Sequence, residues 1–162
     1  MPPERNITTS IAWKVRAFRP SDERAISEIL RQSREAAQWP PESYANLANS
    51  PGGVLLVSEV DAQVIGFVAA RQASDEAEIL NIAVHRDFRR KGVASALLLA
   101  ALDTFSRSAV SAVFLELRES NLPACTLYQG HGFVVSGRRK LYYTDPAEDA
   151  VCMLRKFTAA GD

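Results

Sequence analysis

Arg89-Arg90-Lys91-Gly92-Val93-Ala94 is the stretch of sequence from which the fold of this chain can be worked out. It stands between an apolar, β-branched run at 78–85 and a run at 91–107 whose apolar residues recur with helical spacing. This order predicts a strand that leads into a helix. The first turn of a helix presents backbone N–H groups without internal partners, and the helix dipole adds positive potential there. Because Gly92 and Ala94 are small, we expect an anion, typically a phosphate, to approach this backbone closely.

Outward from this junction, apolar runs predict the remaining elements. Runs at 54–60 and 64–70 are separated by three residues, which predicts an antiparallel hairpin. Further strands are expected at 14–18, 112–117, 133–136 and 150–154, the last two around a polar loop that contains tyrosines. Helices are expected after an N-cap at Ser21, at 42–48 and at 121–130. This order predicts an α+β fold with a local crossover, not a doubly wound sheet.

Length and composition restrict the possible function. The 162 residues suit one domain, which we expect at 14–157, with a flexible N-terminal extension at 1–13 and a tail at 158–162. The formal net charge of zero argues against a nucleic-acid or membrane-surface partner, and no apolar run approaches the roughly 20 residues that span a bilayer. Cys125 and Cys152 lack metal or redox spacing, so we expect free thiols, no metal site and a cytoplasmic protein. A monomer and a homodimer are both compatible with the sequence.

Two other phosphate-binding motifs are missing from the sequence. Without G-x-x-x-x-G-K-[ST] a nucleotide triphosphatase is disfavoured, and without G-x-G-x-x-G a dinucleotide-binding fold is disfavoured. Taken alone, the hexapeptide is also compatible with a solvated basic loop that only caps a helix.

Three segments together resemble the GNAT superfamily of N-acetyltransferases. Residues 89–94 are similar to its [Q/R]-x-x-G-x-[G/A] motif. Asn81-Ile82-Ala83-Val84 before the motif and Leu127-Tyr128 with Gly132-Phe133 after it match the superfamily in the same order. Segments at 78–94, 115–121, 137–143 and 148–150 resemble its RimI-type branch of ribosomal-protein alanine N-acetyltransferases, which acetylate the α-amine of a protein N-terminus.

The resemblance implies a GNAT fold with acetyl-CoA as co-substrate. Its sheet is mixed, mostly antiparallel and six- to seven-stranded, with helices on both faces. The strands expected at 78–85 and 112–117 run parallel and then splay apart, so that the pantetheine arm bonds to freed backbone groups. The residues implied in cofactor binding are Ile82, Ala83, Val84, Arg89, Arg90, Lys91, Gly92, Val93, Ala94 and Asn121, the last of which also suits a helix cap.

Direct acetyl transfer to an amine needs a base and an acid. A free α-amine has a pKa about 2.5 units below that of lysine, so a modest base, acting directly or through water, suffices. By resemblance the first candidate for the base is Glu116, and Glu78 is the second. Tyr128 matches the general acid that protonates the departing thiolate.

The acceptor is less defined than the cofactor. We expect its groove between Trp39 and the tyrosines Tyr142 and Tyr143, although strand-edge packing also explains the tyrosines. The basic run at 138–140 suits either acidic acceptors or solvent. The protein N-terminus is the first interpretation. The alternatives are a small amine, such as an amino acid, polyamine or antibiotic, and a non-catalytic acyl-CoA sensor.

Overall fold

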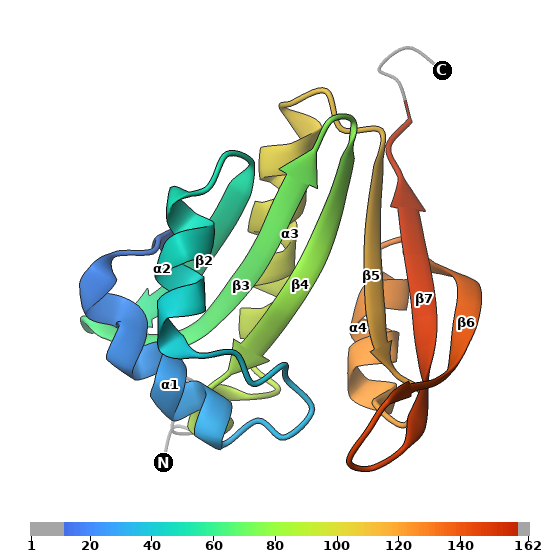
Figure 1. The fold of residues 1–162 in the computed structure, drawn as a ribbon. Helices are drawn as coiled ribbons and strands as arrows, with labels where there is room; N and C mark the ends of the chain where they lie inside the picture. The colour runs from blue at the N-terminus through green and yellow to red at the C-terminus, as the bar shows by residue number, and fades with distance from the viewer. Residues whose placement is uncertain (1–11, 159–162) are drawn as a thin grey trace, which may run out of the picture.

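The computed structural model describes residues 12–158, which contain one seven-stranded sheet with the order β1-β2-β3-β4-β5-β7-β6 (Figure 1). The strands are β1 (Lys14–Ala17), β2 (Gly53–Val60), β3 (Gln63–Ala73), β4 (Glu76–Val84), β5 (Ala112–Arg118), β6 (Val134–Tyr143) and β7 (Glu148–Lys156). Neighbouring strands are antiparallel except for the parallel pair β4–β5. This confirms the predicted α+β fold with a mixed, mostly antiparallel sheet.

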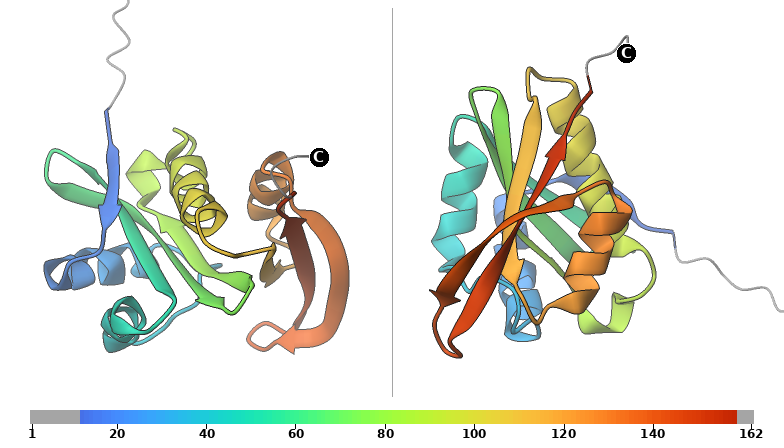
Figure 2. Two further views of the ribbon diagram at one scale, coloured as in Figure 1. Left: turned by 90° about the horizontal axis from the view of Figure 1, so that it is seen from above. Right: turned by 90° about the vertical axis from the view of Figure 1, so that its right-hand side faces the viewer.

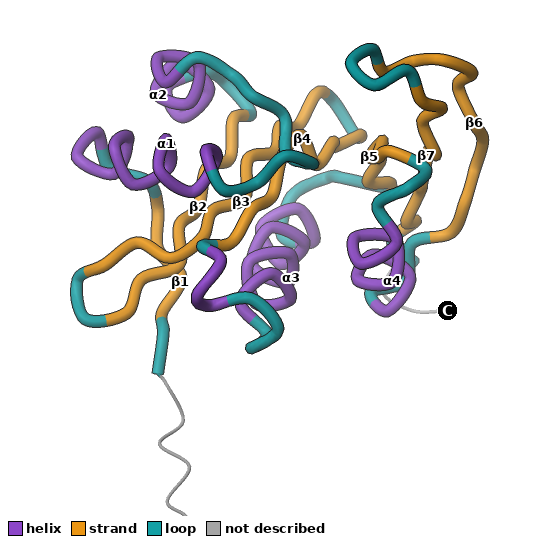
Figure 3. The backbone as a smooth tube through the Cα atoms, turned by 90° about the horizontal axis from the view of Figure 1, so that it is seen from below, coloured by secondary structure: helices purple, strands orange, loops and turns teal. Residues whose placement is uncertain are grey.

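Helices cover both faces of the sheet, as predicted (Figure 2). The helices are α1 (Glu23–Arg31), α2 (Pro41–Asn49), α3 (Val93–Ser106) and α4 (Leu122–Gly130), with short 3-10 turns η1 (Pro20–Asp22) and η2 (Arg86–Phe88). One core lies beneath α1 and α2, where Ile26, Ile29 and Tyr44 pack with Phe67. The other contains Leu97, Leu98, Ala101 and Phe105 of α3, which extends its apolar stripe over the opposite face. Helix α4 lies on the same side as α3 (Figure 3).

The parallel pair β4–β5 comes apart soon after it begins. Its register comprises Glu76↔Ala112, Ala77↔Val113 and Glu78↔Phe114. Beyond these residues β4 stays paired with β3 and β5 with β7, so a gap opens between them (Figure 1). A register shift beside Ala69 and Ala70 leaves Leu80 as an extra residue in β4, and such a bulge bends and twists its strand. The splay predicted from the family resemblance is therefore present.

The backbone of β4 points into this gap at alternate residues. The N–H of His85 donates to the carbonyl of Ile65 at 2.7 Å, so residues 85 and 65 form a hydrogen-bonded antiparallel pair. Since such pairs alternate along a ladder, Ala83 also directs its backbone groups towards β3. The backbone groups of Ile82 and Val84 consequently face the gap.

Two local predictions were wrong. The last two strands are much longer than 133–136 and 150–154, and most of the predicted tyrosine loop is strand. Strand β6 is an exposed edge, so packing imposes no apolar alternation on it. Ser21 is not an N-cap, because Pro20 begins a 3-10 turn and α1 starts later, with Asp22 at its N-cap.

The ends of the chain are described only in part. Most of the predicted extension and tail, residues 1–11 and 159–162, lies outside the described residues. Trp13, which the prediction assigned to the extension, packs against the core on the α3 side. Within residues 12–158, no helix is both long enough and apolar enough to cross a bilayer.

Candidate active site

The start of α3 has the geometry of an anion site. Gly92 is its N-cap with φ +87°, in the left-handed region that favours glycine. The N–H of Ala96 donates to the Gly92 carbonyl at 3.0 Å, which is the first bond of the helix, so the N–H groups of residues 93–95 precede the helical ladder. A Cβ on Gly92 would come within 4 Å of Trp13 alone, at 3.9 Å. Glycine is therefore required here by backbone conformation more than by space.

Arg89 fixes the turn before α3. Its guanidinium donates to the Val84 carbonyl at 3.0 Å, to the Gln32 carbonyl at 2.8 Å and to the Ser33 hydroxyl at 3.1 Å. These bonds tie the end of α1 to the turn before α3. Arg89, Arg90 and Lys91 are all exposed, but Arg89 is held by these three bonds, one of which occupies the Val84 carbonyl. Arg90 and Lys91 form no side-chain hydrogen bond or ion pair within residues 12–158.

Helix α4 follows β5 and lies on the β5 side of the gap. Its N-cap is Asn121, whose side-chain oxygen accepts from the N–H of Ala124 at 3.3 Å, so the capping role anticipated for this residue is confirmed. At the other end of α4, His131 Nε2 lies 2.7 Å from the Ser95 hydroxyl. This bond links the end of α4 to the first turn of α3.

Tyr128 is buried on α4 and its ring packs edge-on against Phe133, with centroids 5.6 Å apart. Its hydroxyl forms no hydrogen bond within residues 12–158. Among the described side chains, only the Ser58 hydroxyl is both fully buried and unpartnered, so the tip of Tyr128 touches solvent. Burial, and to a lesser degree the nearby Tyr143, raise the pKa of Tyr128 well above its usual range. The phenol therefore stays protonated and can donate.

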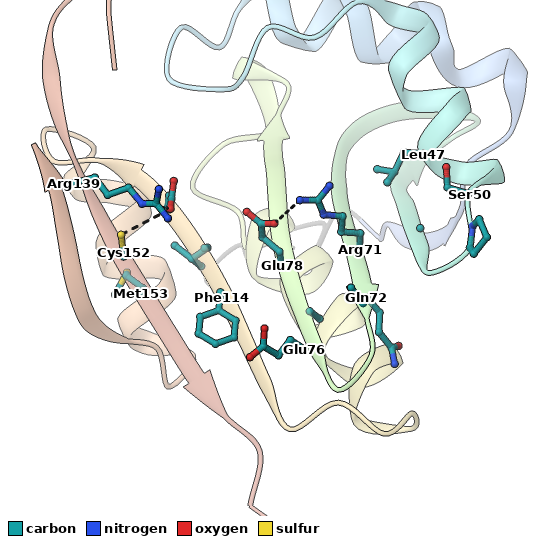
Figure 4. A pocket seen from close by; sticks show the side chains of 16 residues that line it. Leu47, Ser50, Arg71, Gln72, Glu76, Glu78, Phe114, Arg139, Cys152 and Met153 are labelled. Atoms are coloured by element: carbon teal, nitrogen blue, oxygen red, sulfur yellow. Dashed lines mark hydrogen bonds and ion pairs between the residues drawn. The ribbon is translucent and has the colours of Figure 1, made fainter. Parts of the chain in front are cut away.

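Strand β5 presents Glu116 on the face opposite α4. Val113, Leu115 and Leu117 enter the core beside α3, so the alternating Glu116 points to the other face. There Glu116 lines a groove of about 710 Å³ that runs from α2 across β3, β4 and β5 to β7 (Figure 4). Chemistry-bearing side chains in this groove are Arg71, Glu76, Glu78, Glu116, Arg139 and Cys152.

Both candidate bases lie in this groove, and each has a guanidinium partner. Glu78 accepts from Arg71 at 3.1 Å, and Glu116 pairs with Arg139 at 2.8 Å. The Glu116 side chain is 23% exposed and that of Glu78 is 39% exposed. Sequence reasoning missed Arg139 as a partner of Glu116, because the polar run 138–140 gave no alternation from which to assign it to a face.

The tyrosine pair lies next to Glu116. The rings of Tyr142 and Tyr143 meet edge-on at 5.1 Å, and the negative charge of Glu116 raises the pKa of Tyr142. Burial is the main cause that raises the pKa of Tyr143 to about 12. Cys152 Sγ lies 4.0 Å from Glu116 Oε1, a neighbour that sequence reasoning did not foresee.

Trp39 lies on the β4 side of the gap. Its ring packs against Tyr44 at 5.3 Å, and neither Trp39 nor the tyrosine pair lines the groove itself. Asn81, buried in β4, fixes this loop: its amide donates to the Ala37 carbonyl at 2.9 Å and to the Tyr44 hydroxyl at 3.0 Å. A lone asparagine in an apolar strand was the available signal for this anchor, although no role was predicted for it.

Comparison with known proteins agrees with this geometry. The sequence model of the Acetyltransferase (GNAT) family matches residues 23–133. The [ribosomal protein bS18]-alanine N-acetyltransferase of Escherichia coli K12 is 37% identical over 128 residues, which cover 76% of this chain and 84% of that protein.

Solved structures give the same result. The structure of the ribosomal-protein alanine N-acetyltransferase from Escherichia coli aligns with a TM-score of 0.81 and 28% identity, covering 93% of this chain and 97% of that one. A Bacillus anthracis structure that contains acetyl coenzyme A aligns with a TM-score of 0.66 and 25% identity, covering 75% of this chain and 70% of that one.

The splayed sheet, the glycine turn before α3 and these matches define an acyl-transferring class of protein. The chain belongs to the GNAT family of acetyltransferases. It is an N-acetyltransferase that uses acetyl-CoA, as the sequence predicted.

Proposed function

We propose that this enzyme transfers the acetyl group of acetyl-CoA to the N-terminal α-amine of a ribosomal protein. The Escherichia coli relative, whose name specifies an alanine of ribosomal protein bS18, supports this acceptor. The proposal rests above all on the β4–β5 gap, which connects the N-terminus of α3 to the open face that carries Glu116. A ribosomal acceptor would meet the enzyme in the cytoplasm.

The cofactor would lie along this gap. N–H groups of residues 92–95 would receive its diphosphate, aided by the helix dipole and by Arg90 and Lys91. The amides of the pantetheine arm would bond to the backbone groups of Ile82 and to the N–H of Val84, with Ala83 between them and Asn121 opposite. A backbone N–H near Ile82 would polarise the thioester carbonyl.

Glu116 would remove the proton of the acceptor's ammonium, directly or through a water molecule. Its lower exposure and its place beside the tyrosine pair favour it over Glu78. The neutral amine then attacks the thioester carbonyl. The nitrogen of the tetrahedral intermediate loses its second proton to solvent, and collapse of the intermediate releases the thiolate of coenzyme A. The protonated Tyr128 would supply a proton to that thiolate.

The acceptor preference can be tested with matched amines. The purified chain is assayed with acetyl-CoA and peptides beginning with alanine, the same peptides with a blocked N-terminus and an internal lysine, and a panel of small amines. We expect kcat/KM to be highest for free N-termini, because an α-amine loses its proton about 2.5 pKa units more easily than lysine. Preferential acetylation of blocked peptides or of a small amine would refute the proposed acceptor.

A further inference from the structure

The Arg139 side chain spans a whole strand to reach the groove. Arg139 lies on the edge strand β6 opposite Ala150 of β7, while Glu116 on β5 pairs with Cys152 of β7. Strands are about 4.8 Å apart, so the guanidinium must extend over β7 to pair with Glu116. The small residues Ala150 and Cys152 leave room for this crossing. Figure 4 shows the Arg139 side chain directed from β6 towards the groove, with Glu78 on the other side.

The groups around the Arg139 guanidinium form a site that suits an ammonium ion as well as a guanidinium. Its Nε lies 2.8 Å from Glu116 Oε1, and its charge lies 5.5 Å from the Tyr142 ring centroid. A carboxylate beside an aromatic face also attracts an ammonium ion. We propose that Arg139 holds, in the acceptor-free enzyme, the place that the acceptor's ammonium takes beside Glu116, and that the acceptor must displace it. This inference rests on the proposed role of Glu116 as the base.

The contacts of Arg139 suit displacement. Its side chain is 59% exposed, and it lies at a register irregularity in β6. A solvent-exposed ion pair of this kind is worth little, so a competing cation can replace it. Arg118 shows the opposite case: it is 19% exposed, donates to the Pro146 carbonyl at 3.0 Å, pairs with Glu148 and lies 4.5 Å from the Tyr143 ring centroid. The enzyme thus has one anchored arginine and one replaceable arginine on the same face.

The other groups around Glu116 leave it dependent on this one cation. Cys152, Tyr142 and Tyr143 contribute no positive charge, and Glu78 across the gap is already paired with Arg71. Within residues 12–158, Arg139 is the only cationic side chain in contact with Glu116. Once Arg139 is displaced, the Glu116 carboxylate oxygen that it contacts is free to contact the ammonium of the acceptor. Arg139 is therefore a built-in competitor that a cationic acceptor must displace from Glu116.

The test separates KM from kcat in two matched variants. Arg139→Ala removes the competing cation, so KM for an N-terminal peptide should fall by about two- to fivefold while kcat stays within about twofold. Arg138→Ala is the control, because Arg138 is adjacent on the same strand but pairs with Glu119. It should leave KM unchanged. Millimolar methylguanidinium should raise the KM of Arg139→Ala back towards the wild-type value and compete with the peptide.

Four outcomes would overturn the inference. A higher KM in Arg139→Ala would make Arg139 an acceptor ligand. A lower kcat at unchanged KM would mean that Arg139 only orients Glu116. An equal fall in KM in Arg138→Ala would mean that the effect comes from the net charge of the surface and not from the position of Arg139. If Arg139→Ala does not fold, as judged by thermal melting, Arg139→Gln takes its place with the same expected split. If the wild-type enzyme acetylates no N-terminal peptide, the proposed function is refuted. If the wild type is active and Arg139→Ala has the same KM and kcat, only this inference is refuted.

Discussion

In the proposed reaction, the two strands that border the gap contribute in different ways. Strand β4 offers backbone: after its bulge, Ile82 and Val84 face the gap with main-chain groups, and the chain continues into the glycine turn before α3. Strand β5 offers side chains, with Glu116 on one face and α4, which carries Tyr128, on the other. The difference suggests that cofactor binding depends on backbone geometry, while acceptor chemistry depends on a few exchangeable side chains. If so, changes on the β5 side should act on kcat, and changes on the β4 side on cofactor affinity.

The largest effect is expected from Glu116→Gln. Loss of the base should lower kcat by about a thousandfold, within the range of general-base catalysis, while the affinity for acetyl-CoA stays the same. Steady-state kinetics with an N-terminal peptide and calorimetric titration with acetyl-CoA measure the two quantities.

Glu78→Gln is the matched control for this prediction, because it removes a carboxylate from the same groove on the β4 side. Its kcat should remain within about threefold of wild type. If Glu78→Gln instead caused the larger loss, the base would lie on β4 and the contrast between the two strands would fail.

The strand, turn and helix around Gly92 could be predicted from the sequence because their signals are local. Gly92 marks a left-handed turn, and the apolar runs around it mark the strand and the helix. The splay was reached only through the family resemblance, since a bulge at Leu80 leaves no mark in the hydrophobic pattern. A structural feature can be predicted from the sequence where it depends on the residue type at that position, as the turn at Gly92 does.

The contacts around Glu116 and Trp39 were not predicted from the sequence because they are tertiary contacts. The edge strand β6 is polar almost throughout, so nothing in its sequence shows that Arg139 crosses β7 to reach Glu116. Asn81 holds the loop before Trp39 through contacts that span more than 30 positions in the chain. Hydrophobic periodicity does not report on such contacts, which only the folded chain reveals.

The second prediction concerns the acid. Tyr128→Phe should lower kcat by about tenfold to a hundredfold, at or below the lower end of acid catalysis, because a thiolate is a good leaving group even without a proton. The affinity for acetyl-CoA should change little, since the hydroxyl has no hydrogen bond within residues 12–158 whose loss would disturb the fold. Rapid-quench measurement of a single turnover separates this chemical step from product release. An unchanged single-turnover rate would remove Tyr128 from the chemistry.

Among Glu116→Gln, Tyr128→Phe and Gly92→Val, the last should have the smallest effect, and it tests the β4 side directly. A β-branched residue at φ +87° costs about 1–2 kcal/mol, so the turn should rearrange and withdraw the N–H groups of residues 93–95 from the diphosphate. The dissociation constant for acetyl-CoA should rise by about tenfold, the equivalent of 1.4 kcal/mol, with kcat at saturating cofactor nearly unchanged.

Gly137→Val is the control, because Gly137 has no positive φ and a Cβ there would meet nothing within 4 Å. Thermal melting of both variants shows whether the strain at Gly92 lowers the stability of the fold and leaves the affinity for acetyl-CoA unchanged. A Gly92→Val variant that melts like wild type and binds acetyl-CoA equally well would place the diphosphate elsewhere, and the backbone would then have no special part in holding the cofactor.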